Sequence, residues 1–103
     1  MATGRPYELT LAPEFEEQAD KISRWWATNR PAASDLFEGE LDAALARIAA
    51  RPEIGRRLRS ATIKNARCVL LLRSGYLLFY RVFPLTREVH VVHIRHGRRR
   101  PLK

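Results

Sequence analysis

The sequence predicts an α+β protein: an N-terminal strand and an antiparallel helix hairpin packed on one face of a small, mainly antiparallel β-sheet. Two patterns predict this class. Apolar residues in the first half recur at helical spacing, whereas the second half contains short apolar stretches separated by breaks with glycine or proline. A chain of 103 residues can bury one core about two layers deep, so we expect a single domain over residues 1–103.

Spacing near the N-terminus predicts the first strand and the first helix. Tyr7, Leu9 and Leu11 alternate with polar residues, which is typical of a short strand with one buried face. Pro13 can open a helix because its missing N–H has no partner in the first turn, and the glutamates that follow suit the positive end of the helix dipole. The helix is predicted over residues 13–29. Its apolar face consists of Phe15, Ala19, Ile22 and Trp26.

The second helix is predicted over residues 33–50, after a link short enough to make the two helices antiparallel. Ser34 or Asp35 is available as its N-cap. Trp25 and Trp26 diverge by about 100° on the first helix. We favour partial burial of both rings in the core; the alternative is that one ring lies at a partner surface. The apolar stripe of the second helix consists of Phe37, Leu41, Ala44, Leu45 and Ile48.

After a loop over residues 53–60, strands are predicted at 66–73, 76–83 and 88–95. Both faces of the middle strand are apolar: Tyr76, Leu78, Tyr80 and Val82 on one, and Leu77, Phe79, Arg81 and Phe83 on the other. Because two helices cover only one face, we expect the other to be exposed, apolar and edged by arginine, as in a binding surface. The alternative is that the sheet curls and its loops hide this face.

Charge is divided unequally along the chain. Residues 1–50 carry five basic and nine acidic side chains, net −4, and residues 51–103 carry fourteen and two, net +12, which together give +8. A basic half attracts nucleic acid or an acidic protein; a solvated arginine-rich surface is the alternative. No signal-peptide pattern and no run of about 20 apolar residues occurs. We therefore expect a cytoplasmic protein with no membrane partner.

Groups that could hold a metal or a cofactor are scarce. The sequence has no Gly-rich phosphate loop, metal-ligand motif or nucleophile elbow. Cys68 is the only cysteine, which excludes an intramolecular disulfide. Strand alternation is expected to put His90 and His96 on one face and His93 on the other, so the three imidazoles cannot share a metal. We expect no metal and no cofactor.

The end of the chain allows one kind of catalysis. A histidine can act as general acid or base, and arginines can stabilise the charge that develops on a phosphorane, so metal-free RNA cleavage through the 2′-OH is chemically possible. The residues that would do this are His96, Arg98 and Arg99, beside Arg95. We favour anion binding or partner docking without catalysis.

A family resemblance rests on the order of the predicted elements and on short segments in the second half. These are Arg67 just before Val69-Leu70-Leu71, Arg73-Ser74-Gly75-Tyr76, Phe79-Tyr80-Arg81-Val82 and His96-Gly97-Arg98-Arg99. With a strand, a helix hairpin, an antiparallel sheet and a basic tail in this order, the chain resembles the RelE/ParE superfamily of type II toxin components over residues 7–101. The last segment looks like the histidine-to-arginine close of ParE-type toxins.

The superfamily contains two activities. RelE-like members cleave mRNA on the ribosome, using basic residues on the strands around the hairpin and residues near the C-terminus, whereas ParE-like members inhibit DNA gyrase. Alignment at the turn 73–76 places Val69 and Leu71 where RelE has lysines, and Leu77 where it has an arginine. These side chains neither bind phosphate nor move protons. The departure favours the ParE-like branch.

The residues near the C-terminus match the mRNA-cleaving members at some positions and differ from them at others. Arg98 and Arg99 keep the chemistry of the mRNA-cleaving members, but the C-terminal tyrosine of several of these has no counterpart after His96. Other nuclease members use histidine here. The alternative therefore stays open that the chain is a ribosome-dependent mRNA endoribonuclease, with the ribosome and mRNA as partners and His96, Arg98 and Arg99 as catalytic residues. Whether it is an enzyme is uncertain, and we favour binding.

The resemblance implies a toxin that inhibits DNA gyrase by binding and is neutralised by a small cognate antitoxin. The antitoxin's disordered segment is expected to fold across the helix hairpin and the exposed sheet face. Operator DNA would be contacted only through the antitoxin. Antitoxin binding is expected at Arg67, Arg73, Leu77, Phe79, Arg81 and Phe83. Target binding is expected at Arg95, His96, Arg98, Arg99 and Arg100, in and before a basic tail, 97–103, that is mobile unless bound. A partner-binding protein that is no longer toxic is a third reading.

Overall fold

Strands and helices follow the predicted order in the computed structural model, which describes residues 4–59 and 64–97. The elements are β1 (Glu8–Leu11), α1 (Pro13–Asn29), the 3-10 turn η1 (Pro31–Ala33), α2 (Ser34–Ala50), the 3-10 turn η2 (Pro52–Ile54), β2 (Arg56–Arg57), β3 (Ala66–Leu71), β4 (Tyr76–Phe83) and β5 (Glu88–His96). In the described part of the chain, no helix is both long enough and apolar enough to cross a membrane.

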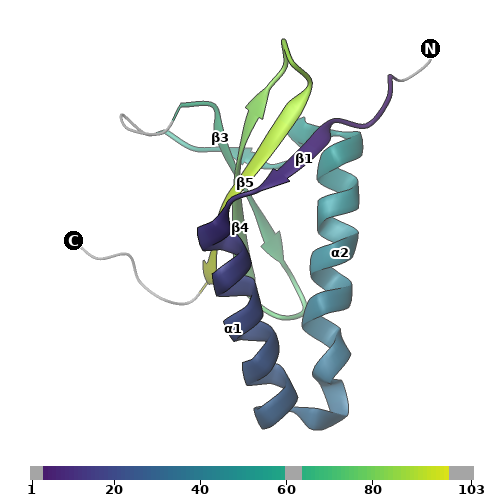
Figure 1. Ribbon diagram of the computed structural model, residues 1–103, viewed down its shortest axis with the longest axis vertical. Helices are drawn as coiled ribbons and strands as arrows, with labels where there is room; N and C mark the ends of the chain where they lie inside the picture. Colours follow the sequence, from purple (N-terminus) through teal and green to yellow (C-terminus); the bar gives the residue numbers. More distant parts are fainter. Residues whose placement is uncertain (1–3, 60–63, 98–103) are drawn as a thin grey trace.

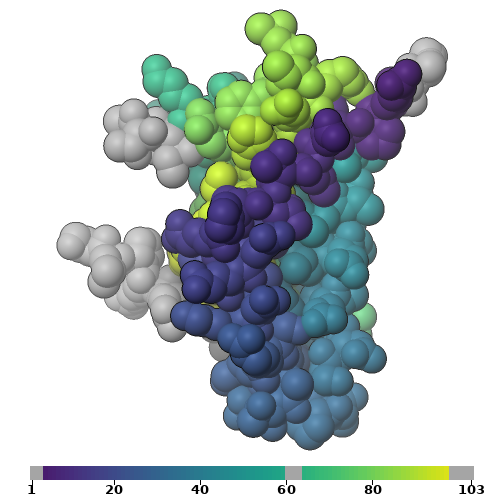
Figure 2. Space-filling view, in the orientation of Figure 1, coloured from purple at the N-terminus to yellow at the C-terminus, as the bar shows by residue number. Residues whose placement is uncertain are grey.

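The strands form one mixed sheet in the order β1-β5-β4-β3-β2. β1 is parallel to β5, and all other neighbours are antiparallel. The two helices run side by side and cover one face of this sheet, while the β4–β5 turn projects beyond them (Figures 1 and 2). The α+β class predicted from the sequence is confirmed.

The helix boundaries have local causes. Pro13 stands at the start of α1 with Glu14 and Glu16 in the first turn, and the helix ends before Pro31. α2 differs from the prediction at its N-terminus, because the turn η1 makes Ala33 the N-cap and draws Ser34 into the helix, so neither predicted side-chain cap forms.

Two features of the sheet were missed by the sequence patterns. β2 is a pair of arginines that joins the sheet beside β3, within the stretch predicted as a loop. A two-residue strand is too short to show any periodicity. β3 ends at Leu71, two residues earlier than predicted, because the backbone N–H of Gly75 bonds to the carbonyl of Leu71 and closes the turn; Gly75 has a φ of +88°, which favours glycine.

A β-bulge in β5 corrects the predicted faces of that strand. Phe79 is opposite His93 and Tyr80 is opposite Val91, so Val92 is the extra residue. Beyond Val92 the alternation is reversed. His90 and His93 therefore share one face and His96 lies on the other, whereas simple alternation paired His90 with His96.

We call the face that packs on α1 and α2 the helix-side face; on β4 it carries Tyr76, Leu78, Tyr80 and Val82. The opposite, outer face carries Leu77, Phe79, Arg81 and Phe83. The fully buried core lies between the helix-side face and the helices, and its largest members are Tyr80, Phe37, Ile48, Leu71, Leu78, Val89 and Val91. Both predicted helix stripes pack on this core.

Tyr80 fastens the loop after α2 to the core. Its hydroxyl donates to the carbonyl of Pro52 at 2.7 Å and accepts the N–H of Gly55 at 2.9 Å. A Cβ at position 55 would overlap the Tyr80 hydroxyl, so glycine is required there by space. Burial raises the pKa of the Tyr80 phenol, which therefore stays a neutral donor.

Candidate functional site

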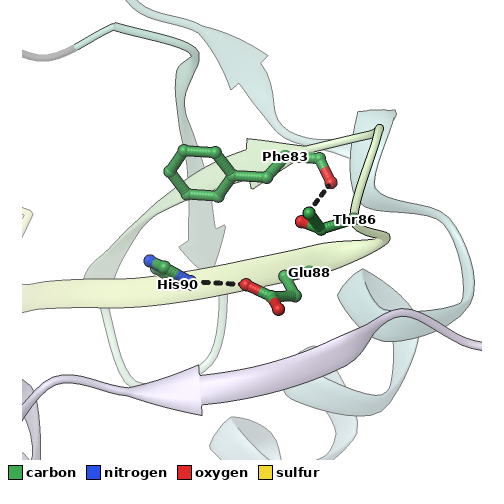
Figure 3. Close-up of polar contacts among 4 residues, drawn as sticks. All are labelled: Phe83, Thr86, Glu88 and His90. Carbon is green, nitrogen blue, oxygen red and sulfur yellow. Dashed lines mark hydrogen bonds and ion pairs between the residues drawn. The ribbon is translucent and has the colours of Figure 1, made fainter.

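The outer face of the sheet is the first candidate surface. Alternation on β4 and the bulge in β5 place an imidazole beside each outer-face phenylalanine: the ring centroids of Phe79 and His93 are 5.6 Å apart, and those of Phe83 and His90 are 4.5 Å apart. Figure 3 shows the second pair at the end of the β4–β5 hairpin. There the Glu88 carboxylate lies 3.1 Å from Nε2 of His90, and the Thr86 hydroxyl donates to the Phe83 carbonyl.

Arginines lie over these aromatic rings. The guanidinium of Arg95 is 5.4 Å from the centre of the Phe79 ring, and that of Arg81 is 4.9 Å from the centre of the Phe83 ring. Arg81 is also held by the carbonyl of Lys64, to which its Nε donates. As a result Phe79 and Phe83 are only half-exposed. The outer face is therefore a layer of cations and imidazoles over aromatic rings, rather than the bare apolar surface expected.

β3 contributes only uncharged side chains to the outer face. Ala66, Cys68 and Leu70 stand opposite the outer-face residues of β4, whereas Val69 and Leu71 belong to the helix-side face. The two positions compared with the strand lysines of RelE thus lie on the side away from the outer face. Cys68 is buried, and burial raises the pKa of its thiol although nearby arginines act in the opposite direction.

Arg67 and Arg73, two of the residues expected to meet an antitoxin, have different surroundings. Arg67 also lies on the helix-side face, where its guanidinium donates to the carbonyls of Glu53 and Gly55 at 3.1 and 2.6 Å. It supports the loop that Tyr80 fastens. Arg73 is exposed in the β3–β4 turn, where its backbone N–H donates to the Glu40 carboxylate at 2.7 Å.

Glu40 of α2 holds the β3–β4 turn. Besides the Arg73 N–H, its carboxylate accepts the N–H and the hydroxyl of Ser74, both at 2.8 Å. Burial by itself would raise the pKa of this carboxyl, but the three hydrogen bonds and the Arg73 charge together outweigh burial and lower it. The turn is therefore fixed to the helix hairpin by an ionised carboxylate.

The second candidate surface is a groove of about 860 Å³ between α1, the β3–β4 turn and the end of β5, which we call the α1–β5 groove. Its apolar wall consists of Ile22, Trp25, Trp26, Tyr76 and Ile94. Its cationic side chains are Lys21, Arg30, Arg73 and Arg95, accompanied by His93 and His96. Among the described residues, no acidic side chain lines it.

Aromatic contacts shape this groove. Trp26 donates from Nε1 to the Tyr76 hydroxyl at 3.3 Å, and the His96 ring meets the Tyr76 ring edge-on with centroids 5.2 Å apart. Trp25 packs edge-on against Trp26 but is 47% exposed. The expectation that both tryptophans are partly buried core residues is therefore wrong for Trp25, which lies on the surface of the groove.

Only some of the predicted target-binding residues belong to the described part of the chain. Arg95 and His96 line the α1–β5 groove. Arg98, Arg99, Arg100 and the rest of the predicted mobile tail after Gly97 lie outside the described residues. Two cationic groove residues, Lys21 of α1 and Arg30 at the C-cap of this helix, were not predicted. The only sequence signal for them is their position beside the apolar stripe of the helix.

The chemistry within reach is anion binding. Within residues 4–59 and 64–97, no group of three or more histidine, cysteine, aspartate or glutamate side chains could hold a metal ion. His90 has Glu88 as a partner, and Nδ1 of His93 lies 3.0 Å from Nε2 of Gln18. His96 lines the α1–β5 groove together with Arg30, Arg73 and Arg95. This arrangement suits carboxylates or phosphates of a partner.

Comparison with known proteins identifies the family. The model of the family described as ParE toxin of type II toxin-antitoxin system, parDE, matches residues 9–101. No curated protein sequence matches the chain closely enough to count as a relative.

Solved structures agree on the fold. The isolated RelE toxin of E. coli is 22% identical with a TM-score of 0.68, over 91% of this chain and 87% of that one. The chromosomal ParDE system of P. aeruginosa is 14% identical with a TM-score of 0.71, over 90% and 98%. The RelBE2 toxin-antitoxin complex of M. tuberculosis is 17% identical with a TM-score of 0.63, over 88% and 98%. The chain belongs to the ParE toxin family of type II toxin-antitoxin systems, within the RelE/ParE superfamily.

Proposed function

We propose that the chain is a cytoplasmic ParE-like toxin that inhibits DNA gyrase by binding and needs no metal or cofactor. The observation that carries the proposal is the absence of strand cations on the outer face of β3. Its outer positions are Ala66, Cys68 and Leu70, so a cleavage mechanism that depends on basic residues of this strand has no groups to use there. The opposite outer position on β4, Leu77, is also apolar.

A cognate antitoxin is the second part of the proposal. The similar structures include toxin-antitoxin complexes from E. coli and M. tuberculosis, which supports a partner of this kind. We propose that the antitoxin binds the helix hairpin and the outer face, at Leu77, Phe79 and Phe83, and pairs acidic residues with Arg73 and Arg81. Arg67, on the helix-side face, contributes indirectly, because its guanidinium holds the loop of Glu53 and Gly55. Operator DNA is contacted through the antitoxin.

We propose Arg95 and His96, together with the tail residues Arg98, Arg99 and Arg100, as the gyrase-binding element. Arg95 and His96 lie at the end of β5, where the N–H of Gly97 bonds to the carbonyl of Gly75 at 2.7 Å. This bond holds Gly97 beside the β3–β4 turn. The tail therefore begins at a fixed point next to the cationic groove.

One pair of assays separates the two activities of the superfamily. Purified protein is tested for inhibition of gyrase supercoiling and, in parallel, for mRNA cleavage on translating ribosomes. The proposal predicts inhibition without cleavage. The proposal is contradicted if the wild-type chain leaves supercoiling unaffected and cleaves mRNA, and if this cleavage is lost in His96→Ala.

The ribonuclease alternative keeps one observation in its favour, which is that His96 shares a groove with arginines and, among the described residues, with no acidic side chain. His90→Ala is the matched control for this alternative, because it removes an imidazole from the same strand but from outside the groove. Both variants are first checked for an unchanged unfolding midpoint, so that loss of fold is not taken for loss of activity.

A further inference from the structure

The edge of β5 is only partly covered by β1. The pairing of β1 with β5 ends at Leu11 and Val91, and the N–H of Ala12 then bonds to the Val91 carbonyl as the chain turns into α1. β5 continues to His96. In the described part of the chain, no strand lies beside residues 92–96 on this side.

A side chain from α1 occupies the start of this uncovered edge. Gln18 accepts the backbone N–H of Ile94 with Oε1 at 3.0 Å, and its Nε2 lies 3.0 Å from Nδ1 of His93. A side-chain amide here imitates the peptide group of a missing neighbouring strand. The backbone of β5 at this point is thus set up for strand pairing, and the Gln18 side chain occupies the position that a neighbouring strand would take.

The α1–β5 groove borders this edge, and its charge specifies the chemistry of an occupant. Lys21, Arg30 and Arg73 line the groove together with the exposed Trp25, with no acidic lining residue in the described ranges. An occupant must therefore carry negative charges and must offer apolar side chains to the tryptophan wall. The tail of this chain, which is rich in arginine, has the wrong charge.

We propose that the α1–β5 groove binds an acidic peptide segment in extended conformation, which pairs with the end of β5 as an added strand and replaces the Gln18 amide. Trp25 lies one helical turn from Lys21, and Trp26 one turn from Arg30, so the side of such a strand that faces α1 must offer both apolar and acidic side chains. This inference rests on the proposed function in one respect: the antitoxin is taken to supply the segment.

The test uses a synthetic probe and the full-length chain. A fluorescently labelled peptide of repeated Glu-Glu-Val-Val, which puts both glutamate and valine on each face of a strand, is titrated with the wild-type protein, and binding is followed by anisotropy. The groove variant Lys21→Glu/Arg30→Glu should weaken binding about tenfold or more, because two attractive charges become repulsive. The control variant Arg24→Glu/Arg51→Glu has the same net charge, but neither position lines the groove, so it should bind within about twofold of the wild type.

A second probe tests strand pairing itself. The same peptide with N-methyl groups on alternate backbone nitrogens keeps its charge and its side chains but loses the donors of one edge. The proposal predicts that methylation on the pairing edge abolishes binding and that methylation on the other edge does not. Equal binding of both methylated peptides, or equal weakening by the groove and control variants, overturns it.

An RNA probe and the gyrase assay distinguish the proposal from its alternatives. A single-stranded RNA oligonucleotide that binds in a groove-dependent manner, where the acidic peptide does not bind, overturns the proposal in favour of a nucleic-acid site. Gyrase inhibition is not an input to any of these titrations. A chain that binds the peptide as predicted but leaves supercoiling unchanged refutes the proposed target and supports the groove, and the reverse result refutes the groove alone.

Discussion

The two faces of β4 carry nearly the same kinds of side chain but differ in how deeply these are buried. On the helix-side face Leu78 and Tyr80 are completely buried, under α1 and α2. On the outer face Leu77 and Phe79 stay half-exposed. What differs is the neighbouring element: helices with apolar stripes on one side, and on the other the cations and imidazoles of the adjacent strand.

The comparison teaches that apolar composition alone does not make a binding surface. On the outer face each phenylalanine keeps an arginine over its ring and an imidazole at its side. Such a layer is soluble without a partner, yet it offers aromatic area and positive charge to an acidic segment that displaces the arginines. We expect the helix-side face to determine stability and the outer face to determine recognition.

The sharpest test of this division compares neighbours on one strand. Leu78→Ala should lower the free energy of unfolding by about 2–5 kcal/mol, because it leaves a cavity in a closed core. Leu77→Ala removes the same atoms from the outer face and should cost less than about 1 kcal/mol. Both values come from chemical denaturation. Equal losses would show that the two faces are not distinct in the way described.

Tyr80→Phe should have the next largest effect. The hydroxyl serves both the Pro52 carbonyl and the Gly55 N–H in a fully buried place, so its removal leaves two backbone groups without a partner. We expect a loss of about 1–3 kcal/mol in unfolding free energy. Tyr76→Phe is the matched control and should cost less, since its hydroxyl has one longer bond, from Trp26.

Arg95→Gln probes the layer over the outer face. The loss of the guanidinium above Phe79 should reduce stability by only about 0.5–1 kcal/mol, the usual range for an exposed cation–π contact. Its effect on gyrase inhibition should be larger than its effect on folding. A variant that unfolds markedly more easily than the wild type but inhibits supercoiling normally would contradict the role assigned to Arg95.

The smallest expected effect concerns Glu40, which joins the helix hairpin to the β3–β4 turn. Its pKa in the folded protein is below its ordinary value of 4.5, so its contribution to stability is present above that pH and is lost as pH falls through the folded pKa. Glu40→Gln should therefore be less stable than the wild type near neutrality and should approach it in acid. Thermal unfolding at several pH values measures this, with Asp42→Asn on the exposed side of α2 as control.

Strong periodicity made much of this architecture predictable. The helical stripe from Phe15 to Trp26 and the turn residues Ser74 and Gly75 fixed the order of elements and the two faces of β4. The bulge at Val92 was not predictable, because a run of valines and histidines alternates equally well in either register. For the same reason the sequence pattern grouped His90 with His96, whereas in the structure His90 shares its face with His93.

The candidate site was less predictable than the fold. The α1–β5 groove depends on where β1 ends along β5 and on which turn of α1 packs against β5. Neither feature can be predicted from a local sequence pattern. Gln18, Lys21 and Arg30 look like ordinary surface residues of an amphipathic helix. Only the packing of α1 across the end of β5 makes them neighbours of Arg95 and His96.

The most direct measurement of the central claim is plasmid topology in cells that express the chain. The account predicts that plasmids lose negative supercoils soon after induction while messenger RNAs stay intact, and that co-expression of the cognate antitoxin restores both topology and growth. Plasmids that stay fully supercoiled while transcripts are cut within their coding regions would contradict it.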